Sequence, residues 1–170
     1  MNNRTKKLIK VLNDYGINPN VGAEIGVLFG KNAEGMLNTF PNLKIYLVDS
    51  YDPTTFAHHT HTALEALIMA AERLERFRGR FEWFLRTSVV AAEEIPDYSL
   101  DYAFIDAGHF YEDVVQDIKA WSPKIRHGGI LAGHDYTKRF KGVVRAVCEA
   151  FGGKHERKGD LWWIQMGQKI

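Results

Sequence analysis

Short apolar runs that end in glycine or an acid alternate with segments of helical periodicity along the chain, and this alternation limits the fold more than any other feature. Strands are expected at 21–26, 43–49, 81–86, 100–106 and 128–135. Helices are expected at 4–15, 30–39, 62–78, 88–94, 110–121 and 140–151. Strands and helices that alternate in this way form parallel sheets with right-handed crossovers and helices on both faces. The sequence therefore predicts an open, doubly wound α/β sheet.

The C-terminal segments KHERK and LWWIQM are joined by Gly159-Asp160, a pair typical of a tight turn. They predict a closing hairpin that adds an antiparallel strand at one edge of the sheet. Trp162 and Trp163 alternate in the last strand, so one is expected in the core and the other is left for a partner subunit of a homo-oligomer. The length of 170 residues favours one domain, 1–170, with residues 1–20 as an N-terminal helical segment and 21–170 as its core.

The charge balance excludes several classes of partner. Lys plus Arg number 22 and Asp plus Glu number 21, so no basic excess points to nucleic acid. The apolar runs are too short to span a bilayer, and the N-terminus lacks the pattern of a signal peptide. Cys148 is the only cysteine and is expected to be a small buried residue rather than a nucleophile. These features predict a cytoplasmic protein without nucleic-acid or membrane partners.

Acids stand at the ends of the expected strands. Glu24, Asp49, Asp106 and the pair His134-Asp135 end four of the strands, and His109 follows Asp106 closely. Thr87-Ser88 follows the remaining strand. A buried carboxylate is costly unless something pairs with it, and parallel strand ends meet at one edge of the sheet. The acids are therefore expected to converge on one ligand pocket.

The loop after the first strand indicates what the pocket binds. Gly26 and Gly30 let the backbone approach a ligand and turn into a helix, but their spacing is not the G-x-G-x-x-G of dinucleotide sites. Glu24 would repel a pyrophosphate and attract an amine, which disfavours a nicotinamide-dependent oxidoreductase. Asp49 stands where an acid accepts ribose hydroxyls in doubly wound folds. An adenosine joined to a cationic amino acid, S-adenosylmethionine, fits this set.

AEIGVLFGKNA, IYLVDSYDP and LDYAFIDAGHFYEDVVQDIKAWSPKIRHGGILAGHDY together resemble class I S-adenosylmethionine-dependent methyltransferases. The resemblance is closest to a small bacterial-type branch, from whose pattern the chain departs at Ala107, where glycine is commoner. It implies a seven-stranded sheet in the order 3-2-1-4-5-7-6 with strand seven antiparallel. It also implies which residues contact the cofactor: Glu24, Gly26, Gly30 and Asp106 at the methionine portion, Asp49 at the ribose, and Thr87 with Ser88 at the adenine. Ser50, next to Asp49, is a further predicted cofactor-binding residue.

Methyl transfer to oxygen requires that the acceptor lose a proton, and His109, His134 and Asp106 are the candidate catalytic residues. In the metal-dependent O-methyltransferases that the chain resembles, an acid after strand four and a pair after strand five hold a divalent ion. Those positions are Asp106, His134 and Asp135 here. Magnesium prefers oxygen ligands, so His134 leaves three alternatives open: magnesium, a softer ion such as manganese or zinc, or no metal with His134 as the base.

The sequence thus predicts a methyltransferase that acts on a small-molecule acceptor at a hydroxyl oxygen. The alternative is a catalytically inactive cofactor-binding or scaffold module, against which the retained buried acids argue. The loop histidines His58, His59 and His61 are better explained as pocket-mouth residues than as metal ligands. Lys138, Arg139 and Lys141 either attract an anionic acceptor or begin a solvated helix. Only residues 1–20 and the loop 51–62 remain to build an acceptor pocket, which is therefore open to solvent or completed by a second subunit.

Overall fold

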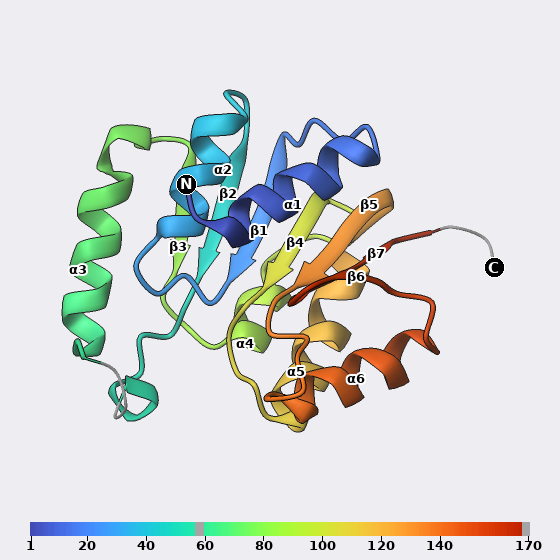
Figure 1. Ribbon diagram of the computed structural model, residues 1–170. Helices are drawn as coiled ribbons and strands as arrows, with labels where there is room; N and C mark the ends of the chain where they lie inside the picture. The colour runs from blue at the N-terminus through green and yellow to red at the C-terminus, as the bar shows by residue number, and fades with distance from the viewer. Residues whose placement is uncertain (57–59, 168–170) are drawn as a thin grey trace.

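A seven-stranded sheet forms the centre of the computed structural model, which describes residues 1–56 and 60–167 (Figure 1). Its strands run in the order β3-β2-β1-β4-β5-β7-β6, and β7 is antiparallel to both of its neighbours. The predicted order and the antiparallel last strand are confirmed. The strands are β1 (Val21–Ile25), β2 (Lys44–Val48), β3 (Phe81–Phe84), β4 (Leu100–Ile105), β5 (Ile125–Gly133), β6 (Glu156–Lys158) and β7 (Leu161–Gln165).

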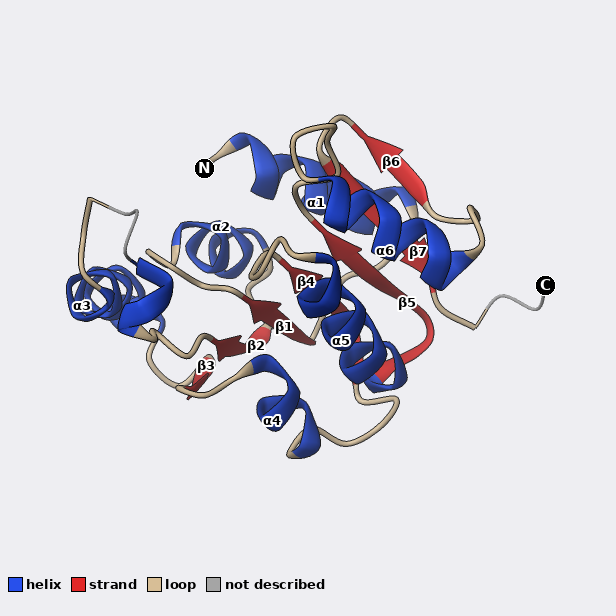
Figure 2. Cartoon of the chain, turned by 90° about the horizontal axis from the view of Figure 1, so that it is seen from below, coloured by secondary structure: helices blue, strands red, loops and turns tan. Residues whose placement is uncertain are grey.

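In the described part of the chain, six α-helices cover the two faces of this sheet in a three-layer arrangement (Figure 2). They are α1 (Asn3–Asp14), α2 (Lys31–Thr39), α3 (Ala63–Leu74), α4 (Ser88–Glu93), α5 (Tyr111–Trp121) and α6 (Lys141–Phe151). The apolar sides of α1, α2 and the end of α3 share one core with the sheet, and those of α4, α5 and α6 share the other. Among the described residues, no helix has the length and apolar character needed to cross a membrane.

The central strand β4 shows why this sheet needs helices on both faces. All six of its residues are buried, with Tyr102 and Phe104 in one core and Ala103 and Ile105 in the other. A largely apolar strand that is buried on both faces is stable only between two covering layers. At roughly 25 cal/mol per Å² of apolar surface removed from water, such burial supplies the main driving force for folding.

The two tryptophans of β7 correct one prediction. Trp162 is 1% exposed and Trp163 is 8% exposed, so both lie in the interior. Trp163 belongs to the core beneath α1 and α2, and Trp162 to the core beneath α6. The expectation that one of them would remain available to a partner subunit is wrong, because α1 covers the face of β7 that the sequence pattern left open.

Element boundaries differ most from the expectations at the start of β5 and the end of α3. β5 begins at Ile125 rather than 128, because Ile125 is buried and pairs with Leu100 before the register shifts. The long predicted helix 62–78 ends at Leu74 and continues as a short 3₁₀ turn to Phe77. Its expected cap is confirmed: the Thr62 hydroxyl accepts the Glu65 N–H, and the Glu65 carboxylate accepts the Thr62 N–H in return.

Candidate active site

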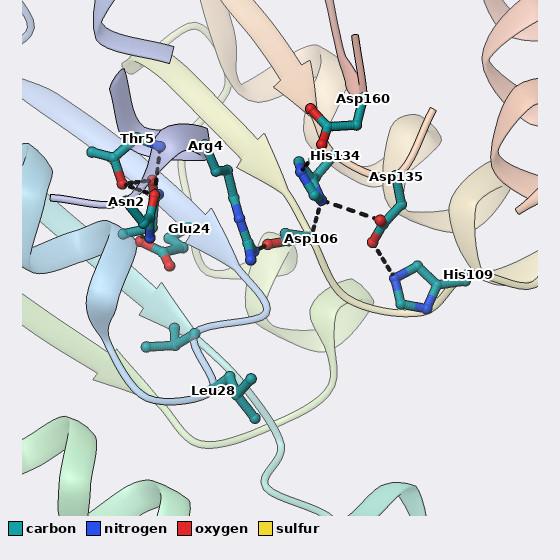
Figure 3. A network of polar contacts seen from close by, with 12 residues as sticks. Asn2, Arg4, Thr5, Glu24, Leu28, Asp106, His109, His134, Asp135 and Asp160 are labelled. Carbon is teal, nitrogen blue, oxygen red and sulfur yellow. Dashed lines mark hydrogen bonds and ion pairs between the residues drawn. The ribbon is translucent and has the colours of Figure 1, made fainter. Parts of the chain in front are cut away.

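The carboxyl ends of the parallel strands meet at one edge of the sheet, as the sequence predicted. The backbone N–H of Asp106 donates to the carbonyl of Ile25 at 2.7 Å, and the N–H of His134 donates to Ile105 at 3.0 Å. These bonds tie the residues that follow β1, β4 and β5 to one another. The chemically active side chains at the ends of β1, β4 and β5 therefore gather in one place, which Figure 3 shows from close by.

Position 26, in the loop between β1 and α2, requires glycine for a steric reason. Gly26 has φ +89°, and a Cβ placed there would lie 2.2 Å from the carbonyl oxygen of Asp106. The loop is held from the other side by Asp49, whose carboxylate accepts the N–H groups of Val27, Leu28 and Tyr51 at 2.9–3.0 Å. This loop-ordering role of Asp49 was missed by the sequence analysis, and its predicted contact with ribose stays a prediction.

We expect Gly26→Ala to lower the free energy of unfolding by about 1–3 kcal/mol, because the new methyl group meets backbone and φ is left-handed. The measurement is chemical denaturation of both proteins. Gly79→Ala is the matched control, since Gly79 also has positive φ (+84°) but nothing within 4 Å of its added Cβ. Equal losses for the two variants would mean that the contact with Asp106 contributes nothing beyond the backbone conformation.

Glu24 is buried within β1 and reaches the N-terminal helix through a chain of polar contacts. Its carboxylate accepts the Asn32 amide at 3.1 Å, and the Asn32 oxygen lies 2.8 Å from the Thr5 hydroxyl in α1. Burial raises the pKa of Glu24 to about 8, although the Asn32 hydrogen bond and the charge of Arg4 oppose the rise. A buried acid with this pKa is held ready to ionise when a positive charge arrives beside it.

Asp106 has a cationic partner that the sequence analysis missed. Arg4, in the first turn of α1, forms an ion pair with the Asp106 carboxylate, whose side chain is 6% exposed. Figure 3 shows the Arg4 side chain extending between Glu24 and Asp106. The N-terminal segment is therefore part of the site as well as a cover for the sheet.

A line of alternating imidazoles and carboxylates extends from Asp106 to the surface (Figure 3). His134 Nδ1 lies 3.2 Å from Asp135 and 3.6 Å from Asp106, and its Nε2 lies 3.2 Å from Asp160 in the β6–β7 turn. His109 Nε2 lies 2.6 Å from the other oxygen of Asp135. Lys7 of α1 neutralises Asp160 at 2.5 Å. Asp160 had been predicted only as a turn residue, so its place beside His134 is new.

Asp135 is fixed in an ionised and strained form at the centre of this line. Partial burial favours its neutral form, but the hydrogen bonds with His109 and His134 outweigh it and hold the pKa of Asp135 well below its usual range. Its φ is +58°, and Leu28 and Tyr51 of the same site are further non-glycine residues with positive φ. Backbone strain of this kind persists where the surroundings enforce it and is common in functional sites.

The residues predicted beside the adenine have other partners here. The Ser88 hydroxyl accepts the Trp121 indole N–H at 2.9 Å and also hydrogen-bonds Asp117, whose pKa burial raises to about 6. Thr87 precedes α4 and is exposed, as is Ser50. Ser88 thus joins α4 to α5, and the contacts of these three residues with a cofactor stay predictions.

Asp106, His134 and Asp135 place one ligand atom each within 4.8 Å of one another, so the predicted metal group is brought together. The atoms are already engaged, however: Asp106 by Arg4, Asp135 by His109, and His134 by carboxylates on both ring nitrogens. Arg4 and Lys7 supply positive charge that an ion would bring. One imidazole among two carboxylates is also not the all-oxygen set that magnesium prefers. The residues therefore do not fit a resident magnesium ion.

The remaining candidates lie at the rim or elsewhere. His58 and His59 fall outside the described residues, and His61 packs edge-on against Phe29. Lys138, Arg139 and Lys141 are exposed between β5 and the start of α6. Cys148 is half-buried rather than buried, with its sulfur 3.2 Å from the Tyr136 hydroxyl, which corrects the expectation of a core residue. A cavity of about 10 Å³, lined in part by Asp106, His109, His134 and Asp135, marks the centre of the site.

Comparison with known families shows to which family the chain belongs. Residues 23–136, well over half of the chain, match a family described as a methyltransferase domain. The chain belongs to this methyltransferase family. The family and the sheet order together make it a class I S-adenosylmethionine-dependent methyltransferase, as the sequence predicted. Arg4, Lys7 and Asp160 lie outside the matched region, so the family pattern could not have indicated them.

Solved structures share the fold at low sequence identity. A provisionally assigned caffeoyl-CoA O-methyltransferase from Staphylococcus aureus has a TM-score of 0.71 at 12% identity, covering 97% of this chain and 84% of its own. A provisionally assigned O-methyltransferase from Klebsiella pneumoniae has 0.65 at 19%, covering 96% and 79%. A provisionally assigned methyltransferase from Streptococcus mutans, in complex with SAH (S-adenosylhomocysteine), has 0.66 at 14%, covering 92% and 96%.

One curated relative, the uncharacterized protein y4gI of Sinorhizobium fredii, is 38% identical over 64 residues. The match covers 37% of this chain and 7% of that relative. The match therefore spans only a small part of that much longer relative, which adds no information on a substrate.

Proposed function

We propose that this methyltransferase moves a methyl group from S-adenosylmethionine to a hydroxyl oxygen of a small-molecule acceptor. The observation that carries the proposal is the His109–Asp135 pair beside the strand-end acids. Asp135 contacts only Nε2 of the His109 ring and leaves Nδ1 without a contact to it. An imidazole oriented by a carboxylate is a device for removing a proton. Methylation of a hydroxyl needs that device, because the oxygen must lose its proton as the methyl group is transferred.

The cofactor portion of the site fits S-adenosylmethionine in its chemistry. When bound, the cofactor supplies a methyl group already activated by a positive sulfur. Glu24 provides a buried acid for a cationic group, and Gly26 lets the loop after β1 pass directly against the backbone of Asp106. Asp49 is proposed to accept the ribose hydroxyls, and Thr87 with Ser88 to border the adenine.

His109 is a better proton acceptor than His134 in this geometry. Both nitrogens of His134 lie near carboxylate oxygens, which accept hydrogen bonds but cannot donate them. Both ring nitrogens of His134 are therefore engaged, and neither is free to face an acceptor hydroxyl. His109 has one nitrogen on Asp135, and its side chain is 41% exposed. We therefore assign His109 as the base and His134 as the residue that positions Asp135 and Asp106.

Calorimetric titration with S-adenosylmethionine, first with EDTA and then with manganese or magnesium, tests the cofactor and the metal together. We expect binding in the micromolar range that changes less than about threefold on adding either ion, because Arg4 and Lys7 already balance the acids. A metal-dependent gain of tenfold or more would instead make Asp106, His134 and Asp135 ligands of a resident ion. Manganese alone, titrated without cofactor, is the control for adventitious binding.

The inactive scaffold remains the competing function, and the same titration addresses it. A scaffold that has lost the cofactor would show no binding under either condition. A scaffold that retains the cofactor would bind it but would form no SAH with any hydroxyl-bearing acceptor. Screening phenols, alcohols and hydroxy acids for SAH formation therefore completes the test of the proposed function.

A further inference from the structure

Arg4 places a positive charge between two strand-end acids at the centre of the proposed cofactor site. Its ion pair with Asp106 connects it to the end of β4, and its positive charge opposes the rise that burial causes in the pKa of Glu24 in β1. The contacts of Thr5 with Asn32, which binds Glu24, hold the first turn of α1 in register with the same carboxylate. The position of Arg4 relative to Glu24 is therefore built into the fold.

The guanidinium of Arg4 is only partly used. The ion pair with Asp106 involves Nη1, whereas Nε is buried and finds no hydrogen-bond partner among the described residues. The edge formed by Nε and Nη2 is the one that grips a carboxylate through two parallel hydrogen bonds. A buried N–H without an acceptor is costly, so this edge is a place where an incoming anionic group would be stabilised.

We propose that Arg4 binds the carboxylate of the amino-acid portion of the cofactor. The inference rests on the proposed function, because it assumes that S-adenosylmethionine occupies this edge of the sheet. An α-amino acid carries one cationic and one anionic group on a single carbon. Glu24 can pair with the ammonium group of the cofactor. Arg4 is the cation beside Glu24, and it can pair with the carboxylate of the cofactor while its Nη1 remains on Asp106.

Other roles of Arg4 would affect cofactor binding differently. Were Arg4 present only to neutralise Asp106, its free edge would have no ligand to recognise, and the cofactor carboxylate would not matter for affinity. Were it present for an anionic acceptor, cofactor binding would be independent of it. The contribution of the carboxylate itself is therefore the quantity to measure.

The experiment compares three ligands by calorimetry: SAH, its analogue lacking only the carboxylate, and 5′-methylthioadenosine, which lacks the amino-acid portion. We expect wild-type protein to bind SAH about 10–100-fold more tightly than the decarboxylated analogue, the range for charge-assisted hydrogen bonds. Arg4→Met should lose this preference, with its affinity for 5′-methylthioadenosine unchanged within about twofold. Arg4→Lys, which keeps the charge but not the two-pronged edge, should retain part of it.

Lys10→Met is the matched control, because Lys10 lies on the same helix and pairs with the exposed Asp14. It should leave all three affinities unchanged, and thermal unfolding verifies that each variant is folded. Equal weakening of SAH and its decarboxylated analogue in Arg4→Met would overturn the inference, as would a wild-type protein that binds the two equally. Failure of the wild type to bind any of the three ligands would overturn the proposed function as well.

Discussion

Replacing His109 with asparagine should lower kcat by about 10²–10⁴-fold, the usual contribution of a positioned base, while the affinity for SAH changes less than about threefold. Asparagine keeps a polar group near Asp135 but cannot accept a proton at neutral pH. The effect is expected on kcat because the substitution removes the ring that Asp135 holds at 2.6 Å from its carboxylate oxygen. The proposed cofactor residues Glu24 and Asp49 are unchanged in this variant. The measurement is SAH formation with an acceptor found by the screen of hydroxyl compounds.

His127→Asn is the control for the loss of an imidazole, because His127 lies near the start of β5, at the opposite end of the strand, and stacks on Tyr98. It should retain wild-type kcat. Asp135→Asn should lower kcat as well, because an amide no longer fixes the His109 ring as a carboxylate does. If His134→Asn abolished turnover and His109→Asn left it intact, the assignment of the two histidines would be reversed.

The fold was largely predictable because its signals are local. The alternation of strand and helix patterns is set by hydrophobic periodicity, which depends on residues a few positions apart. The strand-end acids were predictable for a topological reason, since parallel strands present their carboxyl ends at one edge. Glu24 and Asp106 could therefore be placed together, although they lie far apart within the matched residues 23–136.

The cations of the site could not be predicted in the same way. Arg4 and Lys7 lie on a helix whose pattern marks them as ordinary solvent-facing residues, and Asp160 is a common turn residue. Their roles depend on how α1 and the β6–β7 turn pack over the strand ends, a contact between distant parts of the sequence. The same packing buries Trp163 and makes the N-terminal segment part of the candidate site.

This packing also explains why the predicted ligand group Asp106, His134 and Asp135 does not fit a resident magnesium ion. The sequence showed two acids and a histidine in positions that hold an ion in related enzymes, and it showed no cation near them. The structure adds Arg4 at Asp106, and Lys7 at Asp160 behind His134. A cluster of carboxylates needs positive charge, and in this fold the N-terminal helix supplies part of it.

Replacing Glu24 with glutamine should stabilise the protein at alkaline pH and weaken cofactor binding. Glu24 is 2% exposed, and burial raises its pKa from 4.5 to about 8 in the folded protein. The folded wild type therefore holds a proton that the unfolded chain releases, so its stability is full below pH 4.5 and is lost as the pH rises through about 8. Glutamine keeps a neutral group of the same shape and removes this loss.

The difference between the two proteins should be small at pH 4.5 and should grow to as much as about 5 kcal/mol at pH 8.5, since each pH unit between the two pKa values is worth about 1.4 kcal/mol. Denaturant unfolding at several pH values measures it, with Glu82→Gln on the exposed face of β3 as the charge-loss control. The same variant should bind SAH about 10–100-fold more weakly, because an amide cannot pair with the ammonium. A Glu24→Gln protein less stable than wild type at pH 8.5 would mean that Arg4 and Asn32 keep Glu24 ionised without a ligand. Greater stability together with weaker binding would identify Glu24 as an acid that is retained for a cationic ligand, at the expense of the fold.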